Sequence, residues 1–261
     1  MEIISFVNQK GGVSKTTSCV NIGAILGEMG KKVLLIDFDP QGNLTQAVGL
    51  FKATIKYSIY DVLCGEVDIS HAIKKTAYDN LYIIPAEMNL SNFDGDFNNV
   101  KNRENILKGI LEDMPLSEYD YLFIDCSPSL SLLTVNALVA SESIIIPMEP
   151  SIFAFNGLAQ LIKVIKLLQS GLNPNLNIKG IFLTRVDRRS SLSNEFKIEL
   201  KEIFGNKLFS TMIHQNIDIA KAQIKGEPIS FYNKNCNSYN DYLSLTKELL
   251  KRKKDKCLLV K

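Results

Sequence analysis

The stretch NQKGGVSKTT, residues 8–17, decides the fold. It follows the apolar run IISFV (3–7) and precedes a helical pattern over 15–29, so a buried strand leads through a glycine-rich loop into a helix. Such a loop presents backbone N–H groups and a helix N-terminus to an anion. The stretch therefore predicts a phosphate-binding loop. The residues expected around the phosphates are Gly11, Gly12, Val13, Ser14, Lys15, Thr16 and Thr17.

The loop departs from the common pattern G-x-x-x-x-G-K-[ST] at two positions. Gln9 and Ser14 stand where that pattern has glycine, and an additional lysine, Lys10, opens the loop. Lys15 is expected to reach the β- and γ-phosphates, and the Thr16 hydroxyl to ligate Mg²⁺. If Ser14 is held at positive φ, the strain of about 1–3 kcal/mol would weaken ATP binding roughly ten- to a hundred-fold. A simple strand-to-helix turn and a scaffold that no longer needs nucleotide are the alternatives.

Two later strands end in carboxylates. The segment LLIDFDPQGN (34–43) places Asp37 and Asp39 two residues apart, on one face of a continuing strand, which suits metal binding or water orientation. A turn aspartate before Pro40 is the alternative. The segment YLFIDCSPSL (121–130) ends its apolar run at Asp125, the form of a carboxylate that holds Mg²⁺ directly or through water. The predicted metal site is Thr16, Asp39 and Asp125.

Apolar bursts of strand length alternate with longer helical stretches along the whole chain. The strands are expected at 3–7, 32–37, 81–85, 121–125, 143–147 and 178–184. The helices are expected at 15–29, 44–49, 58–64, 69–74, 103–113, 130–139, 156–170, 192–203 and 237–252. This alternation predicts an α/β fold, a mainly parallel twisted sheet with helices on both faces. We expect a single domain over 1–261, a surface excursion at 89–102 and a frayed basic tail at 251–261.

Composition excludes several classes of protein. The chain has 261 residues, 46% of them hydrophobic and 22% charged, which argues against disorder. The net charge of +2 means that any affinity for nucleic acid must come from a local patch. The five cysteines form no C-x-x-C pair, so neither a zinc site nor a disulfide framework is indicated. Without a signal peptide or a membrane-spanning run, the expected location is the cytoplasm.

Five segments together resemble the ParA/Soj group of deviant Walker A ATPases, which act in bacterial chromosome and plasmid partition. They occur in that family's order and at roughly its intervals, across nearly the whole chain. The segments are NQKGGVSKTT, VLLIDFDPQGNLT, FIDCSPSLSLLTVNAL, GLAQL and GEPISFY. The resemblance implies a P-loop NTPase fold that uses ATP and Mg²⁺, with weak hydrolysis in the absence of a partner.

The same resemblance implies roles for particular residues. Lys10 would reach across an ATP-sandwich homodimer to the partner's nucleotide, as an arginine finger does. Gly11 would lie where the two phosphate sites approach, and Asp39 would position the attacking water. A ParB-type (Spo0J-type) centromere-binding protein would stimulate hydrolysis. Because the chain begins at its first strand, it is similar to members without an N-terminal helix-turn-helix, so sequence-specific promoter binding is not expected.

The resemblance also implies nonspecific duplex DNA as a partner and association with the nucleoid. Arg189 matches a position where relatives carry a DNA-contacting arginine, and Gln215 and Asp218 stand where relatives often have arginines. Lys221 and Lys225 are the candidates to compensate for them. His214 stands where the family commonly has a proline near the adenine.

A related alternative is a MinD-like ATPase that positions itself on a membrane through a C-terminal amphipathic helix. The tail here is KELLKRKKDKCLLVK (247–261), with apolar residues at its two ends and charges between them. A membrane-surface helix needs one continuous apolar face. The tail pattern therefore argues against a membrane-surface helix.

Overall fold

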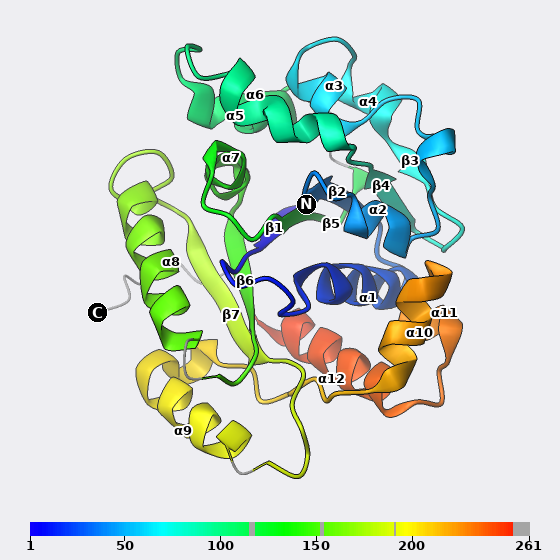
Figure 1. Ribbon diagram of the computed structural model, residues 1–261, viewed down its shortest axis with the longest axis vertical. Helices are drawn as coiled ribbons and strands as arrows, with labels where there is room; N and C mark the ends of the chain where they lie inside the picture. The colour runs from blue at the N-terminus through cyan, green and yellow to red at the C-terminus, as the bar shows by residue number, and fades with distance from the viewer. Residues whose placement is uncertain (115–117, 152–153, 191, 253–261) are drawn as a thin grey trace.

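The computed structural model describes residues 1–114, 118–151, 154–190 and 192–252 (Figure 1). Within them, one sheet has the order β3-β4-β2-β5-β1-β6-β7, and every neighbouring pair is parallel except β3 with β4. The strands are β1 (Glu2–Phe6), β2 (Val33–Phe38), β3 (Lys74–Lys75), β4 (Leu81–Ile84), β5 (Tyr121–Cys126), β6 (Ser143–Met148) and β7 (Asn177–Leu183).

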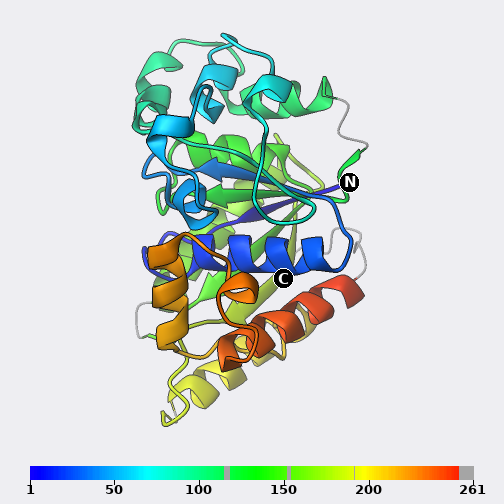
Figure 2. The same cartoon turned by 90° about the vertical axis from the view of Figure 1, so that its right-hand side faces the viewer.

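Helices cover both faces of this sheet, which Figure 2 shows edge-on. The helices are α1 (Lys15–Glu28), α2 (Asn43–Ala47), α3 (Ile59–Leu63), α4 (Ile69–Ala72), α5 (Phe93–Asp96), α6 (Ile106–Glu112), α7 (Leu132–Ala140), α8 (Ala154–Gln169), α9 (Leu192–Phe204), α10 (Ile217–Lys225), α11 (Ile229–Tyr232) and α12 (Asn237–Lys251). Short 3₁₀ turns lie at Lys52–Thr54, Met88–Asn92, Arg103–Asn105 and Gly205–Lys207.

Successive residues of a buried strand contribute to two separate cores. In β2, Leu34 and Ile36 pack into the core beneath α3, α4 and α6–α9, whereas Val33 and Leu35 pack into the core beneath α1, α2 and α10–α12. Side chains alternate between the faces of a strand, so a strand covered on both sides is apolar at nearly every position. This confirms the predicted fold class.

The carboxyl ends of the central strands meet at one edge of the sheet. The register pairs Phe6 with Asp125 and Asp37 with Asp125, so the ends of β1, β2 and β5 are aligned. β1 lies between β5 and β6. The strand order reverses there: β2 and β5 lie on one side of β1, and β6 and β7 lie on the other. In open α/β sheets, ligands bind at this kind of switch point.

The six predicted strands are confirmed to within one residue at each end, but several elements were not predicted. β3 was missed because two lysines carry no apolar signal; it pairs antiparallel with β4 at the sheet edge. α10 and α11 were also missed. In α10, IDIAKAQIK, apolar and polar residues largely alternate rather than follow a helical period, although its cap signals are present: Asn216 accepts a hydrogen bond from the Asp218 N–H, and Gly226 ends the helix at φ 68°.

The segment 89–102 is not the plain surface excursion that its composition predicts. It contains most of one 3₁₀ turn and the whole of α5, and the side chains of Leu90 and Phe93 are buried in the core. The ring of Phe93 also packs against that of Phe97, with centroids 4.5 Å apart. Two apolar side chains thus anchor an otherwise polar loop. Of the tail predicted to fray, Lys251 ends α12 and Arg252 is fixed, while 253–261 lies outside the described residues.

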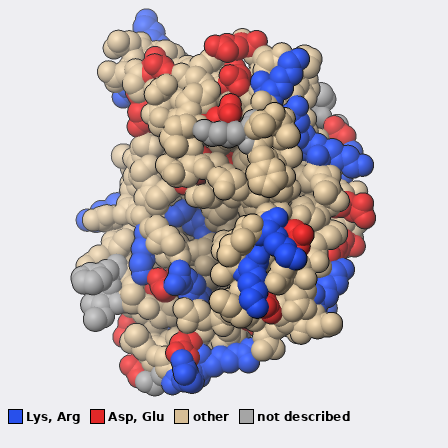
Figure 3. Space-filling view, turned by 45° about the vertical axis from the view of Figure 1, so that its right-hand side comes forward, with Lys and Arg blue, Asp and Glu red and all other residues tan. Residues whose placement is uncertain are grey.

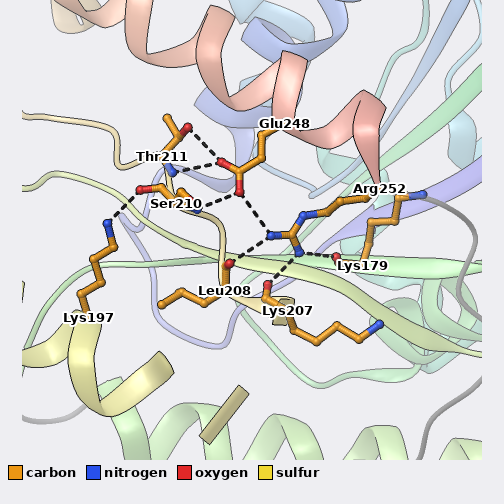
Figure 4. Close-up of polar contacts among 8 residues, drawn as sticks. All are labelled: Lys179, Lys197, Lys207, Leu208, Ser210, Thr211, Glu248 and Arg252. Carbon is orange, nitrogen blue, oxygen red and sulfur yellow. Dashed lines mark hydrogen bonds and ion pairs between the residues drawn. The ribbon is translucent and has the colours of Figure 1, made fainter. Parts of the chain in front are cut away.

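The end of α12 is tied to the segment that follows α9 (Figure 4). The Glu248 carboxylate accepts hydrogen bonds from the Ser210 N–H at 2.8 Å and the Thr211 N–H at 3.0 Å. Arg252 lies 3.6 Å from the centroid of the Phe209 ring. Its guanidinium donates to the backbone carbonyls of Lys179, Lys207 and Leu208. These contacts hold residues 207–211 beside β7.

Gly27, near the end of α1, is required by close packing. A Cβ atom there would lie 2.4 Å from the Asp79 carbonyl oxygen, which is backbone and cannot move aside. We expect Gly27→Ala to lower the free energy of unfolding by about 1–3 kcal/mol in chemical denaturation. Gly109 is exposed on α6, and a Cβ atom built on it would have nothing within 4 Å. Gly109→Ala should raise stability by about 0.5–1 kcal/mol, and destabilisation of equal size in both variants would contradict this account.

Candidate functional site

A cavity of about 1140 Å³ opens at the carboxyl edge of the sheet. Three segments line it: the loop 11–17, the segment 39–47 after β2, and the segment 213–223 that leads into α10. Pro128, which follows β5, and Thr184 and Arg185, which follow β7, complete the wall. The cavity therefore joins the predicted phosphate loop to a second segment, far away in sequence, that carries His214.

The phosphate loop has a shape suited to an anion. α1 begins at Lys15, directly after two residues at positive φ, Gly12 (75°) and Ser14 (60°). The Lys15 ammonium donates to the carbonyls of Asn8 at 2.9 Å and Lys10 at 3.2 Å, so it lies inside its own loop. The first N–H groups of a helix have no partner within the helix, and the first three residues of α1, 15–17, line the cavity. Neither Val13 nor Lys10 is among the residues that line the cavity: the Val13 side chain is buried, and the Lys10 side chain is 40% exposed.

Two opposing effects act on the pKa of Lys15. Burial lowers the pKa of Lys15, while the charges of Asp125 and Asp39 act in the opposite direction. A buried ammonium whose carboxylate neighbours make no ion pair with it at contact distance is poised to accept a stronger anion. The loop thus favours a multiply charged phosphate ligand.

Asp37 and Asp39 have different surroundings, although both follow the same strand. Asp37 is fully buried and accepts hydrogen bonds from the N–H of Thr45 at 2.8 Å and from its hydroxyl at 2.7 Å. Burial raises the pKa of Asp37 to about 6, against the lowering effect of these bonds. Asp39 instead lines the cavity, where its Oδ1 accepts from the Gln41 N–H at 2.9 Å. Asp37 therefore fixes the start of α2, and Asp39 is the carboxylate available to a ligand.

Asp125 is fully buried behind the loop, and neither carboxylate oxygen makes a hydrogen bond to a described residue. Burial and the charge of Asp37 raise the pKa of Asp125 well above its usual value, while the Thr16 side chain and Lys15 favour the charged form. An unpartnered buried carboxylate near a hydroxyl fits a hydrated cation. No group of three or more His, Cys, Asp or Glu side chains among the described residues could hold a metal alone. Mg²⁺ at nucleotide sites needs few protein ligands, because phosphates and water supply the others.

Lys10 contacts its own chain in this structure. Its ammonium lies 2.7 Å from Glu149 Oε2 and 3.4 Å from Ser151 Oγ, just after β6. Glu149 Oε1 lies 3.3 Å from Arg185 Nε, and Arg185 Nη1 donates to the Gly12 carbonyl at 3.3 Å. Sequence reasoning gave Glu149 no role and counted Arg185 only among the basic residues of the C-terminal half. The only available signal was their place directly after buried strands, where Asp39 and Asp125 were found.

The far wall of the cavity is held by α10 and α12. Gln223 on α10 donates to the Thr17 hydroxyl at 2.8 Å, which ties this helix to the phosphate loop. The His214 ring contacts Asp241 on α12, with Nδ1 2.9 Å from Oδ2, and its backbone N–H donates to the same oxygen at 3.0 Å. Asp241 therefore orients His214. His214 lines the cavity, and it is the residue that stands where the family commonly has a proline near the adenine.

The predicted DNA-contacting residues lie outside the cavity. Arg189 is 90% exposed, and its guanidinium pairs with Asp187 at 3.2 Å. Lys221 and Lys225 are exposed on α10, where the Lys225 ammonium lies 5.1 Å from the centroid of the Tyr232 ring. Figure 3 shows Lys and Arg side chains in several groups over the lower half of one face, with Asp and Glu between them. The basic surface is thus interrupted by acidic groups and is not one continuous stripe.

Comparison with known proteins identifies the family. Residues 1–178 match the family model AAA_31, described as an AAA domain. The chromosome-partitioning ATPase Soj of Treponema pallidum is 42% identical over 247 residues, covering 95% of this chain and 96% of Soj. The chromosome partitioning protein ParA of Caulobacter vibrioides is 37% identical over 257 residues, covering 98% and 96%. The chain belongs to the ParA/Soj family of partition ATPases.

A solved structure of similar fold contains a bound nucleotide analog, and the relative from Treponema pallidum is itself named an ATPase. Cobyrinic acid a,c-diamide synthase of Mycobacterium smegmatis, with bound ATP analog and magnesium, superposes with a TM-score of 0.84 at 30% identity, covering 96% of this chain and 94% of that one. This ParA/Soj chain is therefore an ATPase. None of the helices that the described residues form combines the length and apolarity needed to cross a bilayer. The amphipathic-tail alternative falls largely on 253–261, outside the described residues.

The backbone conformation of Ser14 determines whether its strain affects folding stability or nucleotide affinity. Ser14 has φ 60°, in the left-handed region where a residue with a side chain is strained. If the loop keeps this conformation when nucleotide binds, the strain lowers folding stability equally in both states, and the ten- to hundred-fold weakening of ATP binding does not arise. Ser14→Gly should raise the free energy of unfolding by about 1 kcal/mol and change the ATP dissociation constant by less than about threefold. Calorimetric titration together with denaturation would measure both, and a tenfold gain in affinity without a gain in stability would contradict the argument.

Proposed function

We propose that this ATPase acts in chromosome or plasmid partition as an ATP-dependent homodimer that binds nonspecific duplex DNA. A ParB-type centromere-binding protein would stimulate hydrolysis and so release the dimer from DNA. Residues 1–261 would work as a single ATPase domain, located in the cytoplasm on the nucleoid. The observation that carries the proposal is the meeting of Lys15, Thr16, Asp39 and Asp125 at the carboxyl edge of the sheet.

In the proposed site each residue has a separate task. Lys15 would hold the β- and γ-phosphates of ATP, with backbone N–H groups of 11–17 around them. Thr16 would ligate Mg²⁺, and Asp125 and Asp39 would act on it directly or through water. The ion would neutralise charge on the phosphates. Asp39, at the cavity wall, would orient the attacking water.

The dimer proposal rests on the open side of the loop. Gly11 is exposed, and a Cβ atom built on it would have nothing within 4 Å. Lys10 is 40% exposed beside it, on a side chain long enough to leave its present contact. A second copy of the chain could thus approach at Gly11, and each Lys10 would then act on the partner's nucleotide in the manner of an arginine finger.

The scaffold alternative, in which Ser14 abolishes nucleotide binding, loses support from the same geometry. Ser14 occupies the left-handed conformation without displacing Lys15 from the loop, and the cavity remains open in front of it. An unpartnered, fully buried carboxylate at Asp125 would be a cost with no purpose in a scaffold. Binding of a nucleotide with its cation gives that group a partner.

Substitutions should separate binding from hydrolysis. Lys15→Ala should abolish ATP binding, whereas Lys10→Ala should bind ATP as a monomer and lose on the order of 10³-fold in partner-stimulated turnover. Asp39→Ala should form an ATP-bound dimer that hydrolyses slowly, because the water is no longer oriented. Phosphate release and calorimetry would measure these effects. Lys31→Ala, at the opposite edge of the sheet, is the control, and equal loss of affinity in the three site variants would contradict the separate roles.

DNA binding should depend on ATP and on salt. Arg189→Ala should weaken binding to all duplex sequences and reduce the slope of log affinity against log salt by about one unit. Asp187→Asn should act in the opposite direction, because it frees the Arg189 guanidinium and removes a negative charge. Replacing Lys221 and Lys225 together by alanine should weaken binding further. Fluorescence anisotropy with an ATP analogue, ADP or no nucleotide would measure this.

The matched control for DNA binding is Lys108→Ala. Lys108 pairs with Glu112 on the same helix, α6, which covers the face of the sheet opposite to α10. The substitution should leave the affinity and the salt slope unchanged. Full affinity without ATP, or binding that does not respond to salt, would show that DNA binding is not coupled to the dimer.

A further inference from the structure

We propose that Arg185 is a positioning residue that shares the Glu149 carboxylate with Lys10 and thereby controls the release of Lys10 toward a partner's nucleotide. The inference deepens the proposed function and rests on its ATP-dependent homodimer. It assigns a regulatory role to an ion-pair cluster that joins Lys10 of the phosphate loop to two residues outside the quoted motifs, Glu149 and Arg185.

The geometry of the cluster is a carboxylate bridge between two cations. Lys10 Nζ lies 2.7 Å from Glu149 Oε2, and Arg185 Nε lies 3.3 Å from Glu149 Oε1. Each carboxylate oxygen therefore has its own cation. The Glu149 side chain is only 26% exposed, whereas those of Lys10 and Arg185 are 40% and 46% exposed. The least solvated member of the cluster is thus the carboxylate.

This difference in exposure determines the cost of moving Lys10. If Lys10 leaves, a mostly buried carboxylate loses one ion pair, and an unpaired carboxylate in such a place is unfavourable. Arg185 remains beside it, and a guanidinium can pair with both oxygens of one carboxylate. Arg185 can therefore replace the lost contact, which lowers the free energy needed to free Lys10.

The backbone holds Arg185 in the place that this role needs. Its φ of 54° is a left-handed conformation that a residue with a side chain rarely adopts. Hydrogen bonds on either side fix it: the Thr184 N–H donates to the Met148 carbonyl at 2.8 Å, and the Val186 N–H donates to the Ile213 carbonyl at 3.1 Å. Strained residues of this kind persist where the surroundings over-determine them, often at functional sites.

A purely structural role for Arg185 makes a different prediction. Arg185 Nη1 also donates to the Gly12 carbonyl at 3.3 Å, so it could serve only to brace the phosphate loop. In that case its loss would weaken nucleotide binding by the monomer, and the loss would be the same whatever residue stands at 149. If Arg185 acts through Glu149, its effect should disappear once the carboxylate is gone.

The test is a double-mutant cycle on dimerisation. Sedimentation with a slowly hydrolysed ATP analogue would measure the dimer dissociation constant, and calorimetry the affinity of the monomer for nucleotide. Arg185→Met should weaken the dimer about tenfold and leave nucleotide affinity within about threefold of wild type. Glu149→Gln should dimerise at least as tightly as wild type, since Lys10 is no longer held. Adding Arg185→Met to Glu149→Gln should cause no further loss, and Arg185→Lys should recover part of the tenfold effect.

Three results would overturn the inference. Equal weakening by Arg185→Met with Glu149 or Gln at position 149 would show that Arg185 acts on the loop alone, as would a parallel loss of nucleotide affinity. An unchanged dimer in Arg185→Met, with wild-type dimerisation intact, would refute the role of Arg185 and leave the proposed function standing. Absence of an ATP-dependent dimer in the wild type would instead refute the proposed function and this inference with it.

Discussion

β1 pairs in parallel with β5, and β5 pairs in parallel with β2, so that Phe6, Asp37 and Asp125 lie side by side at one edge of the sheet. Every feature of the site depends on this alignment. The phosphate loop leaves the sheet directly after β1, and the carboxylates leave it at the same height on the neighbouring strands. Parallel strands need helical crossovers, so the three chain segments must come from distant parts of the sequence.

The alignment brings together ionisable side chains whose charged forms are disfavoured by burial. Asp37, Asp125 and Lys15 are all buried at the carboxyl ends of neighbouring strands. The pKa values of both carboxyl groups are raised, and the pKa of the lysine is lowered. Each shift means that the protein disfavours the charged form. Asp37 is compensated by hydrogen bonds from Thr45, whereas only the Thr16 side chain and the charge of Lys15 oppose the shift at Asp125. A ligand with both a cation and phosphate groups would supply further partners, and its binding would then be coupled to local stability.

The half of the cavity away from the phosphate loop depends on α12. Glu248 and Arg252 hold 207–211 beside β7, and Asp241 holds His214 a few residues further along. The cavity wall is therefore fixed by a helix that contributes no residue to it. On the opposite side, Glu149 and Arg185 bring the ends of β6 and β7 to the phosphate loop. The nucleotide site is thus enclosed by contacts from both outer parts of the chain.

The sequence alone determined the sheet class, the phosphate loop and the carboxylates that follow β2 and β5. These are local signals: a β-branched apolar run, a glycine-rich turn and an acidic residue at the strand end each depend on a few adjacent residues. It did not show that Asp37 is structural and Asp39 accessible, because Thr45 reaches Asp37 only after α2 packs against β2. Nor did it reveal β3, which has no apolar residue, or α10, in which apolar and polar residues largely alternate. The pairing of Lys10, Glu149 and Arg185 was decided only by tertiary structure, since 139 residues separate the first pair and the parallel sheet alone brings them together.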